Sequence, residues 1–433
     1  MENTQQQLAQ ELIDFIYKSP TAFHAVKTVK EELDQAGFKE LEFSDAWKLS
    51  KGGKYYVTRN NSALIAFIVG EGQIEQHGFK LIAAHTDSPT FRVKPNPEMT
   101  TANYLKLNTE VYGGPIVNTW LDRPLSLAGR VMVKGENPLQ PKTKLVNFNR
   151  PLLIIPNVAI HMNNKVNEGI ELNRQIDTLP LLGLVSETLE KDGFLTKLIA
   201  EELKIDAEDI IDFDLFLYEY EKGSIIGLNQ ELISVGRLDN LAMVHAGITA
   251  LKNAKASLAT NVMVCFDNEE IGSRTRQGAN APMLANVLER IGYALGKERE
   301  DYFRALAHSF MISADMAHAI HPNRPEKHDP VNKPQLDGGP VIKINSNFSY
   351  TSDSDSIAVY EQICKENNIP VQKFVNRSDV RGGSTIGPIS STQVDIRSVD
   401  IGNPMLAMHS IRELASVKDH DYIIQSFNAF YKL

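Results

Sequence analysis

The amino-acid sequence predicts an α/β protein with a mostly parallel sheet flanked by helices, into which a β-rich segment is inserted. Short apolar, β-branched runs end abruptly in polar residues, a pattern typical of buried parallel strands. After residue 237 such runs alternate with segments of helical periodicity, which indicates helices on both faces of the sheet. From about 94 to 235 the chain changes to short alternating strands with many turn residues, which predicts the insertion.

The elements can be assigned in chain order from periodicity and from start and stop signals. The second helix, for example, begins after Ser19-Pro20-Thr21 and ends at Gly37. The expected elements are helices over 4–18 and 21–36, strands around 54–69 with a turn at Asn60-Asn61, a strand over 79–84, a helix over 194–203 inside the insertion, a helix over 238–253, a strand over 261–266, a helix over 281–295, strands over 310–314 and 340–345, a helix over 353–367, a strand over 371–375 and a helical C-terminal region.

A chain of 433 residues is long enough for roughly two to three domains of ordinary size. We therefore expect one α/β domain made of residues 1–93 and 237–433, interrupted by a β-rich domain over 94–236. No internal repeat or low-complexity segment is present.

Composition and charge exclude several classes of function. The chain is 42% hydrophobic and 23% charged, as ordinary soluble proteins are, and its net charge of −9 argues against binding to nucleic acid or anionic membranes. The N-terminus lacks the pattern of a signal peptide, and no apolar run approaches the roughly 18 residues of a membrane helix. The two cysteines, Cys265 and Cys364, fit reduced packing residues, so we expect a cytoplasmic protein.

Several of the apolar runs end in side chains that bind metals. Run 262–266 is followed by Glu269 and Glu270, run 79–84 by His85 and Asp87, and run 310–314 by Asp315. The stretch 402–408 delivers His409 just before an apparent helix, and Asp239 stands where another helix is expected to begin. Ligands of open α/β sheets bind beyond the carboxyl ends of the strands, where buried carboxylates are costly without a cation. This set of imidazoles and carboxylates suits two divalent ions.

Each of these residues also has an ordinary interpretation. A single buried histidine such as His85 is most often a satisfied core residue, and Asp239 alone would be read as a helix cap. Glu269 and Glu270 alone could form a solvated acidic loop, and His318 could lie on the surface. Jointly, however, the residues favour a metal-dependent hydrolase. Neighbouring side chains diverge, so Glu270 can bind a metal while Glu269 faces a water molecule as general base.

Other catalytic motifs are missing from the sequence. There is no His-Glu-x-x-His, Gly-x-Ser-x-Gly, Walker loop or Cys-x-x-Cys. The glycine pairs, such as Gly113-Gly114 and Gly382-Gly383, lack the context of a phosphate-binding loop and are interpreted as turns.

Seven blocks over essentially the whole chain resemble the aspartyl aminopeptidases, a family of dinuclear zinc exopeptidases. The blocks are Ser-Pro-Thr-Ala-Phe-His-Ala-Val (19–26), Ala-Ala-His-Thr-Asp-Ser-Pro (83–89), Gly-Arg-Leu-Asp-Asn (236–240), Asp-Asn-Glu-Glu-Ile-Gly-Ser (267–273), Ser-Ala-Asp-Met-Ala-His-Ala-Ile-His-Pro-Asn (313–323), Ser-Thr-Ile-Gly-Pro-Ile (384–389) and Ala-Met-His-Ser-Ile-Arg-Glu (407–413). Their order and spacing make the resemblance specific.

The resemblance implies a zinc-exopeptidase-like fold and roles for individual residues. One zinc would be held by His85, Asp239 and Asp315, and the other by Asp239, Glu270 and His409. Glu269 would be the general base, with Asp87 supporting His85. The activity implied is the release of N-terminal Asp or Glu from peptides.

The resemblance also implies how the subunits assemble and bind substrate. The β-rich domain would be a dimerisation domain whose His161 reaches the neighbouring subunit's site, and dimers would build a tetrahedral dodecamer open only to small peptides. Three residues match substrate contacts of the family: His318, Lys343 and Tyr350. The ammonium group of Lys343 would pair with an acidic first side chain of the peptide. The stretch Arg381-Gly382-Gly383 departs from many relatives, which carry Cys before the second Gly, so the preferred side chain is less certain than the chemistry.

Three alternatives remain open at this point. The same mechanism could prefer neutral first residues, the chain could be a related dinuclear amidohydrolase or deacetylase, or it could be a non-catalytic assembly or metal-storage protein. Zn²⁺ is the expected metal, with Co²⁺ or Mn²⁺ as alternatives, because carboxylate-rich sites accept all three.

Overall fold

The computed structural model describes residues 2–169, 171–185 and 193–433. The chain folds into two units, which are described separately. Unit 1 comprises Met1–Asp87, Gly223–Met408 and Glu413–Leu433, and unit 2 comprises Ser88–Lys222 and His409–Arg412. Residues 223–236 therefore belong to unit 1, and the short segment 409–412 belongs to unit 2. No helix among the described residues has the length and apolar character needed to cross a membrane.

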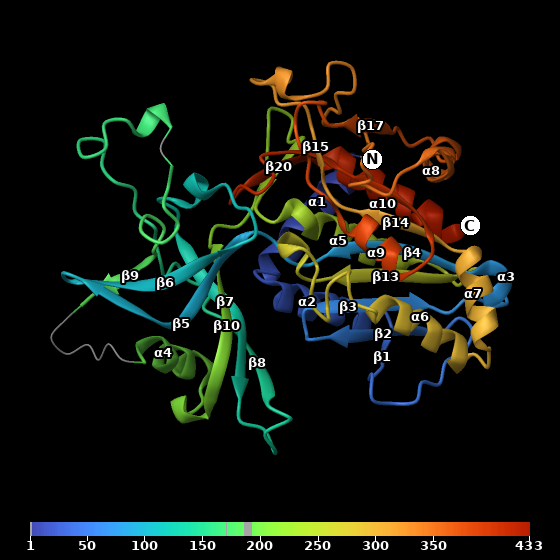
Figure 1. Ribbon diagram of the computed structural model, residues 1–433, viewed down its shortest axis with the longest axis horizontal. Coiled ribbons are helices and arrows are strands. Elements are labelled where there is room, and N and C mark those ends of the chain that lie inside the picture. The colour runs from blue at the N-terminus through green and yellow to red at the C-terminus, as the bar shows by residue number, and fades with distance from the viewer. Residues whose placement is uncertain (1, 170, 186–192) are drawn as a thin grey trace. The chain divides into compact units, whose positions relative to one another are not determined.

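Unit 1 is built on a nine-stranded sheet, counted over the described residues (Figure 1). Its strands, in spatial order, are β1 (Lys39–Glu40), β2 (Lys54–Arg59), β3 (Ala63–Ile68), β13 (Thr260–Phe266), β4 (Phe79–His85), β14 (Phe310–Ala314), β18 (Arg397–Gly402), β16 (Val341–Ile344) and β17 (Gln372–Val375). The central strands β13, β4, β14 and β18 run parallel, whereas β3 and β16 run antiparallel to their central neighbours. The prediction of a mostly parallel sheet is confirmed.

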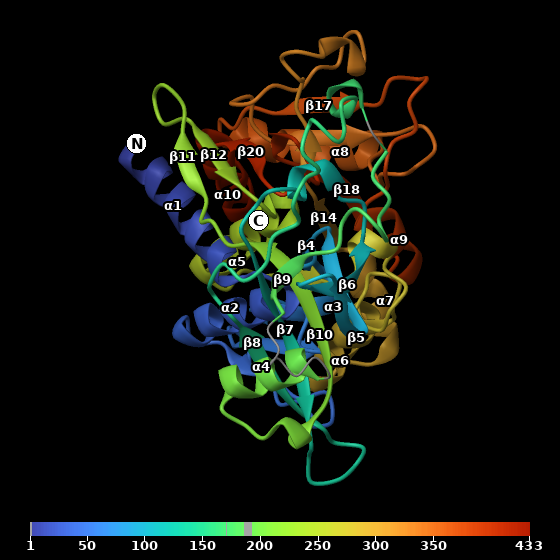
Figure 2. The same ribbon diagram turned by 90° about the vertical axis from the view of Figure 1, so that its left-hand side faces the viewer.

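Helices cover both faces of this sheet, and each face has its own apolar core (Figures 1 and 2). Alternate residues of one strand belong to different cores: Met263 and Cys265 of β13 pack on one face, and Val262 and Val264 pack on the other. The first core is completed by α1 (Glu2–Lys18), α2 (Ala22–Gln35), α5 (Leu238–Asn253), α8 (Ser354–Glu366) and α10 (Val417–Lys432), and the second by α6 (Met283–Ala294), α7 (Arg299–Ala307) and α9 (Ile386–Gln393); α3 (Ile74–His77) is a single turn.

A smaller sheet, five-stranded within the described residues, also belongs to unit 1. Its order is β11 (Ser224–Ile226), β12 (Leu232–Val235), β20 (Glu413–Ser416), β19 (Pro404–Leu406) and β15 (Ala317–His318). The helix expected directly after His409 was wrong, because the chain enters β20 and α10 begins only at Val417. Ala407 and His409 both have positive φ, 57° and 68°, which is incompatible with a continuous right-handed helix.

The described part of unit 2 contains a six-stranded sheet in which every pairing is antiparallel. Its strands, in spatial order, are β8 (Lys142–Asn147), β7 (Leu125–Val133), β10 (Ile210–Glu219), β5 (Thr90–Thr101), β6 (Tyr104–Tyr112) and β9 (Leu181–Leu184). The predicted helix over 194–203 is confirmed as α4 (Phe194–Leu203), whose Leu195 and Ile199 pack into the core of this sheet. Short 3₁₀ turns are η1 (Val117–Trp120), η2 (Val166–Glu168) and η3 (Ala207–Asp209) in unit 2, and η4 (Glu269–Ile271) and η5 (Pro325–Lys327) in unit 1.

Candidate metal centre

The parallel strands bring three of the predicted ligands together at one edge of the large sheet. His85 is the last residue of β4, Asp315 follows β14, and Asp239 stands at the start of α5. One ligand atom of each lies within 4.8 Å of the other two, and all three side chains are buried. His85 Nε2 is 3.5 Å from Asp239 Oδ1. His85 thus shares one buried cluster of ligand atoms with Asp239 and Asp315, which lie 154 and 230 positions later in the sequence.

The adjacent acidic pair contributes to the same edge from the turn η4, which follows β13. His85, Glu269 and Glu270 form a second group whose ligand atoms lie within 4.8 Å of one another. Glu269 Oε2 is 4.0 Å from His85 Nε2. Carboxylate oxygens and an imidazole nitrogen at this spacing are ligands that zinc and related divalent ions accept. The donor set therefore fits such ions.

Asp87 connects the histidine to the acidic turn. Its two carboxylate oxygens accept the main-chain N–H groups of Glu269 and Glu270 at 3.1 and 3.2 Å. His85 Nδ1 lies 3.1 Å from the main-chain oxygen of Asp87 and 3.4 Å from its Oδ1. With Nδ1 engaged in this way, the imidazole presents Nε2 to the ligand cluster.

The start of α5 departs from a regular helix at the point where it presents Asp239. The Asp239–Asn240 peptide is cis, and both residues have non-helical dihedral angles. The main-chain N–H of Asp239 donates to Glu413 Oε2 at 3.1 Å, and Asn240 Nδ2 donates to the carbonyl of Ala314 at 2.9 Å. Sequence analysis did not single out Glu413 or Asn240. Both lie in sequence blocks that resemble the aspartyl aminopeptidases, but their contacts span long sequence separations.

Burial and crowding of like charges dominate the electrostatics of the cluster. Burial raises the pKa of Glu269 to about 8, and the carboxylates of Asp315, Asp87 and Asp239 add to this rise while His85 opposes it. Burial also raises the pKa of Asp315 to about 6, against the lowering effect of Lys343. Burial alone would lower the pKa of His85, but the surrounding carboxylates outweigh it and raise that pKa well above its ordinary value. So many buried carboxylates need compensating positive charge, which divalent cations would supply.

Two of the predicted substrate contacts lie beside this cluster. Lys343 of β16 is only 3% exposed, so it is not an ordinary lysine at a strand edge. Its Nζ is 3.7 Å from Asp315 Oδ2, donates to the carbonyl of Met316 at 3.1 Å, and is 5.3 Å from the ring centroid of Tyr350. Burial alone would lower the pKa of Lys343, but Asp315 and other acidic groups outweigh it and raise that pKa, so the side chain is charged. His318 is exposed at the end of β15, with its ring centroid 5.8 Å from that of Phe374.

Two further residues predicted for the site, His161 and His409, belong to unit 2. His161 lies in an exposed turn. His409 has its Nδ1 3.0 Å from the carbonyl oxygen of Gly114, and its own carbonyl accepts the N–H of Ile116 at 2.8 Å. Their roles at the metal centre stay predictions.

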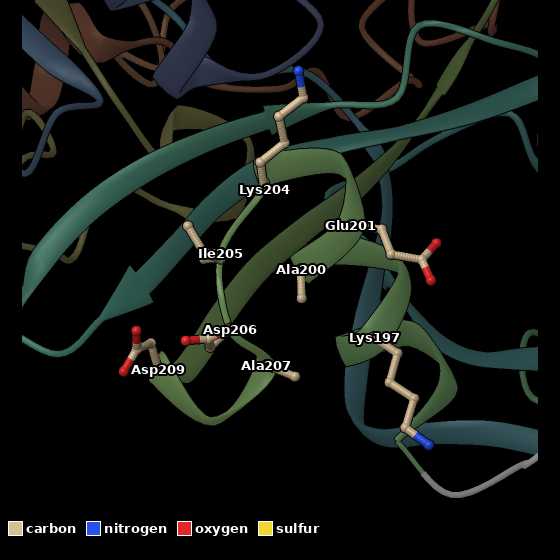
Figure 3. A pocket seen from close by; sticks show the side chains of 8 residues that line it. All are labelled: Lys197, Ala200, Glu201, Lys204, Ile205, Asp206, Ala207 and Asp209. Carbon is tan, nitrogen blue, oxygen red and sulfur yellow. The ribbon is translucent and has the colours of Figure 1, made fainter.

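A surface hollow of unit 2 contains none of the predicted site residues (Figure 3). It is lined by α4, the segment after it and η3, with side chains of both charges: Lys197, Ala200, Glu201, Lys204, Ile205, Asp206, Ala207 and Asp209. The chemistry predicted from the sequence is concentrated in the buried cluster of unit 1 instead.

Residues 15–431 match the family model described as aminopeptidase I zinc metalloprotease (M18). The chain belongs to the M18 aminopeptidase family. It is 63% identical over 426 residues to a protein of Clostridium novyi (strain NT) named "Probable M18 family aminopeptidase 2", and the match covers 98% of each chain. The name and the family model both support a general aminopeptidase activity for M18 members of this kind.

Solved structures of similar proteins have the same fold. A chain in the cryo-EM structure of the Ape4 and Nbr1 complex is 39% identical, with a TM-score of 0.94, covering 99% of this chain and 86% of that one. The S. cerevisiae mApe1 dodecamer is 31% identical, with a TM-score of 0.85, covering 99% and 97%. The predicted α/β class is confirmed by this likeness.

Proposed function

We propose that this M18 aminopeptidase releases N-terminal Asp or Glu from small peptides, as the aspartyl aminopeptidases do. It would do so at a centre of two divalent ions, with Zn²⁺ expected. The observation that carries the acidic preference is the buried, charged Lys343 beside Asp315. The ligands would be His85, Asp239 and Asp315 for one ion, and Asp239, Glu270 and His409 for the other.

The residues of the chain have separate tasks in this proposal. When bound, the ions supply Lewis acidity, which polarises the peptide carbonyl and makes a water molecule more acidic. Glu269 takes a proton from the water as the water oxygen bonds to the carbonyl carbon. It then returns that proton to the leaving amine as the C–N bond breaks. Asp87 holds Glu269 in place through the main-chain N–H.

The substrate's acidic side chain would be recognised by Lys343. An ammonium group has three N–H donors, and the carbonyl of Met316 accepts one of them. The 3.7 Å separation from Asp315 Oδ2 is longer than a hydrogen bond, so donors remain for a substrate carboxylate. Such a charge-assisted bond in a buried site is strong, whereas a neutral side chain would leave the ammonium poorly solvated. We assign Tyr350 and His318 to the same pocket.

Assembly and location form part of the proposal. The β-rich domain predicted over 94–236, whose six-stranded sheet lies in unit 2, would be the dimerisation domain, and the α/β domain predicted over 1–93 and 237–433 would be the catalytic domain. His161 would complete the neighbouring subunit's site, and dimers would build a tetrahedral dodecamer. The known dodecamer of the related S. cerevisiae mApe1 supports this assembly. The two buried free cysteines, Cys265 and Cys364, are consistent with a cytoplasmic protein.

Hydrolysis of a panel of aminoacyl chromogenic amides tests the proposal. Asp and Glu amides would be compared with Leu, Ala and Lys amides, before and after a chelator and with Zn²⁺, Mn²⁺ or Co²⁺ added back. We expect acidic amides to be cleaved first, with activity lost to the chelator and restored by metal. Metal-dependent cleavage of Leu or Ala amides instead would overturn the specificity, and no amide cleavage at all would overturn the aminopeptidase assignment.

A further inference from the structure

Asp400 is a fully buried carboxylate that lies outside the ligand cluster. It belongs to β18, where it pairs in register with Ser313 of β14, two residues before Asp315. A buried carboxylate is costly unless hydrogen bonds replace its lost water. Its hydrogen bonds therefore show what the fold uses it for.

Four donors from three separate segments converge on the two oxygens of this side chain. Oδ1 accepts the hydroxyl groups of Ser313 at 2.5 Å and of Thr385 at 2.8 Å. Oδ2 accepts both the main-chain N–H and the hydroxyl of Thr351, at 2.6 and 2.9 Å. The main chain of Asp400 is tied to the same loop, because its N–H donates to Ser352 Oγ at 3.0 Å.

Thr351 is the residue directly after Tyr350, and Thr385 directly precedes α9. A single side chain thus fixes the loop that carries Tyr350 and the start of α9 against the strand that leads to Asp315. The packing is close: a Cβ placed on Gly387 of α9 would lie 2.4 Å from Asp400 Oδ2. Only glycine lets α9 approach the carboxylate without displacing it.

We propose that Asp400 is a positioning residue for substrate binding, which sets the Tyr350 side of the pocket next to Lys343 by holding Thr351. The inference deepens the proposed function and rests on the assignment of Tyr350 and Lys343 to the substrate pocket. The side-chain hydrogen bonds of Asp400 go to Ser313, Thr351 and Thr385, none of which is a predicted ligand or substrate contact. It acts through the loop, so its loss should weaken binding more than it slows the chemical step.

The pattern of donors predicts which substitution is tolerated. In Asp400→Asn, the side-chain oxygen can still accept both bonds from Thr351. The hydroxyl groups of Ser313 and Thr385 can rotate and accept from the new NH₂ group. Asp400→Ala removes every one of these bonds. We therefore expect the asparagine variant to retain function and the alanine variant to lose it.

The test combines steady-state kinetics on the preferred amide with hydrogen–deuterium exchange of the full-length protein. For Asp400→Ala we expect KM to rise about 10-fold with kcat within about 3-fold, and segments 345–353 and 384–393 to exchange faster. Asp400→Asn should stay within about 3-fold of wild type in both constants. Asp419→Ala is the matched control, because Asp419 is also fully buried and accepts main-chain N–H groups, from Asp337 and Gly339. It should lose stability without the rise in KM.

Gly387→Ala keeps the result interpretable if Asp400→Ala does not fold. It leaves every hydrogen-bonding group in place and pushes the carboxylate off Thr351, so KM should rise here too. An unchanged KM and exchange pattern in both Asp400→Ala and Gly387→Ala would overturn the inference, as would an asparagine variant as impaired as the alanine one. A wild-type preference for neutral amides would overturn the acidic specificity alone, because hydrogen exchange reports on Asp400 without any substrate.

Discussion

The carboxylate of Asp87 accepts the main-chain N–H of Glu269 at 3.1 Å, which fixes the expected general base through its backbone. The same carboxylate holds Glu270, and its Oδ1 lies 3.4 Å from His85 Nδ1. Asp87 is thus shared between a predicted ligand and the predicted base. Binding of metal and proton transfer should therefore depend on it together.

Replacing Asp87 by alanine tests this coupling. We expect metal affinity and kcat to fall together by about 10- to 100-fold, as is usual when the partner of a ligating histidine is removed. The measurements are metal titration by calorimetry and steady-state kinetics at saturating metal. A variant that binds metal and turns over like the wild type would show that Asp87 is dispensable.

Replacing Glu269 by glutamine tests the general base. The amide cannot accept a proton from water, so kcat should fall by about 100- to 10,000-fold while metal content stays unchanged. Elemental analysis and kinetics on the same preparation separate the two effects. Glu366→Gln, at an exposed position of α8, is the matched control and should be fully active. Retained turnover in Glu269→Gln would exclude this residue as the base.

Replacing Lys343 by methionine tests substrate selection. The change keeps the bulk of the side chain but removes its charge, so kcat/KM for the Asp amide should fall by about 10- to 100-fold relative to the Leu amide. Lys373→Met is the control. Lys373 of β17 pairs in register with Ile342 of β16, and its side chain is 44% exposed. An equal loss on both amides, with metal content unchanged, would argue against acidic recognition by Lys343.

A buried histidine pair predicts how stability depends on pH. His245 Nδ1 lies 2.9 Å from His420 Nε2, and the rings stack with their centroids 5.1 Å apart. Burial lowers the pKa of His420 to about 4, and burial together with His420 and Lys252 lowers that of His245 well below its ordinary value. The unfolded chain, with a histidine pKa of about 6.5, binds more protons than the folded chain as pH falls from 6.5 towards 4. Stability should therefore be present at pH 7 and lost in this window.

Each histidine of the pair would contribute up to about 1.4 kcal/mol per pH unit within that window. Urea denaturation of the full-length protein at pH 7 and pH 5, followed by fluorescence, measures the slope. His420→Gln removes one titrating group and should flatten the dependence, whereas substitution of the exposed His308, which has no role in the proposed site, should leave it unchanged. A His420→Gln slope equal to that of wild type would show that the pair does not control acid stability.

Most of the large sheet was predictable because three of its central strands, β4, β13 and β14, carry local signals, whereas the fourth, β18, lies in the C-terminal region that was expected to be helical. The apolar run before His85 and the run before Glu269 are continuous and buried on both faces, so they read as parallel strands without any knowledge of the partners. Their shared direction then placed the polar residues that follow them at one edge. The short strands β15, β19 and β20 were not predicted, because two to four residues carry no usable alternation.

The supporting residues of the site were not predictable for a different reason. Glu413 contacts the N–H of Asp239 across 174 positions, and Asp400 contacts Ser313 across 87. No local pattern marks such a pair, because each acidic residue alone looks like a surface side chain. The helix expected after His409 was wrong for a similar reason. His409 has a positive φ, and histidine, unlike glycine, does not signal a positive φ in the sequence.

Metal content is the most direct test of the central claim, that Asp239 would hold both ions of a two-ion centre. Protein purified without chelator would be analysed by inductively coupled plasma mass spectrometry, together with Asp239→Ala and Asp315→Ala variants shown to be folded by circular dichroism. We predict two ions per chain in the wild type, about one in Asp315→Ala and almost none in Asp239→Ala, because only Asp239 serves both ions. A wild type that binds a single ion, or an Asp239→Ala variant that keeps both, would contradict the account.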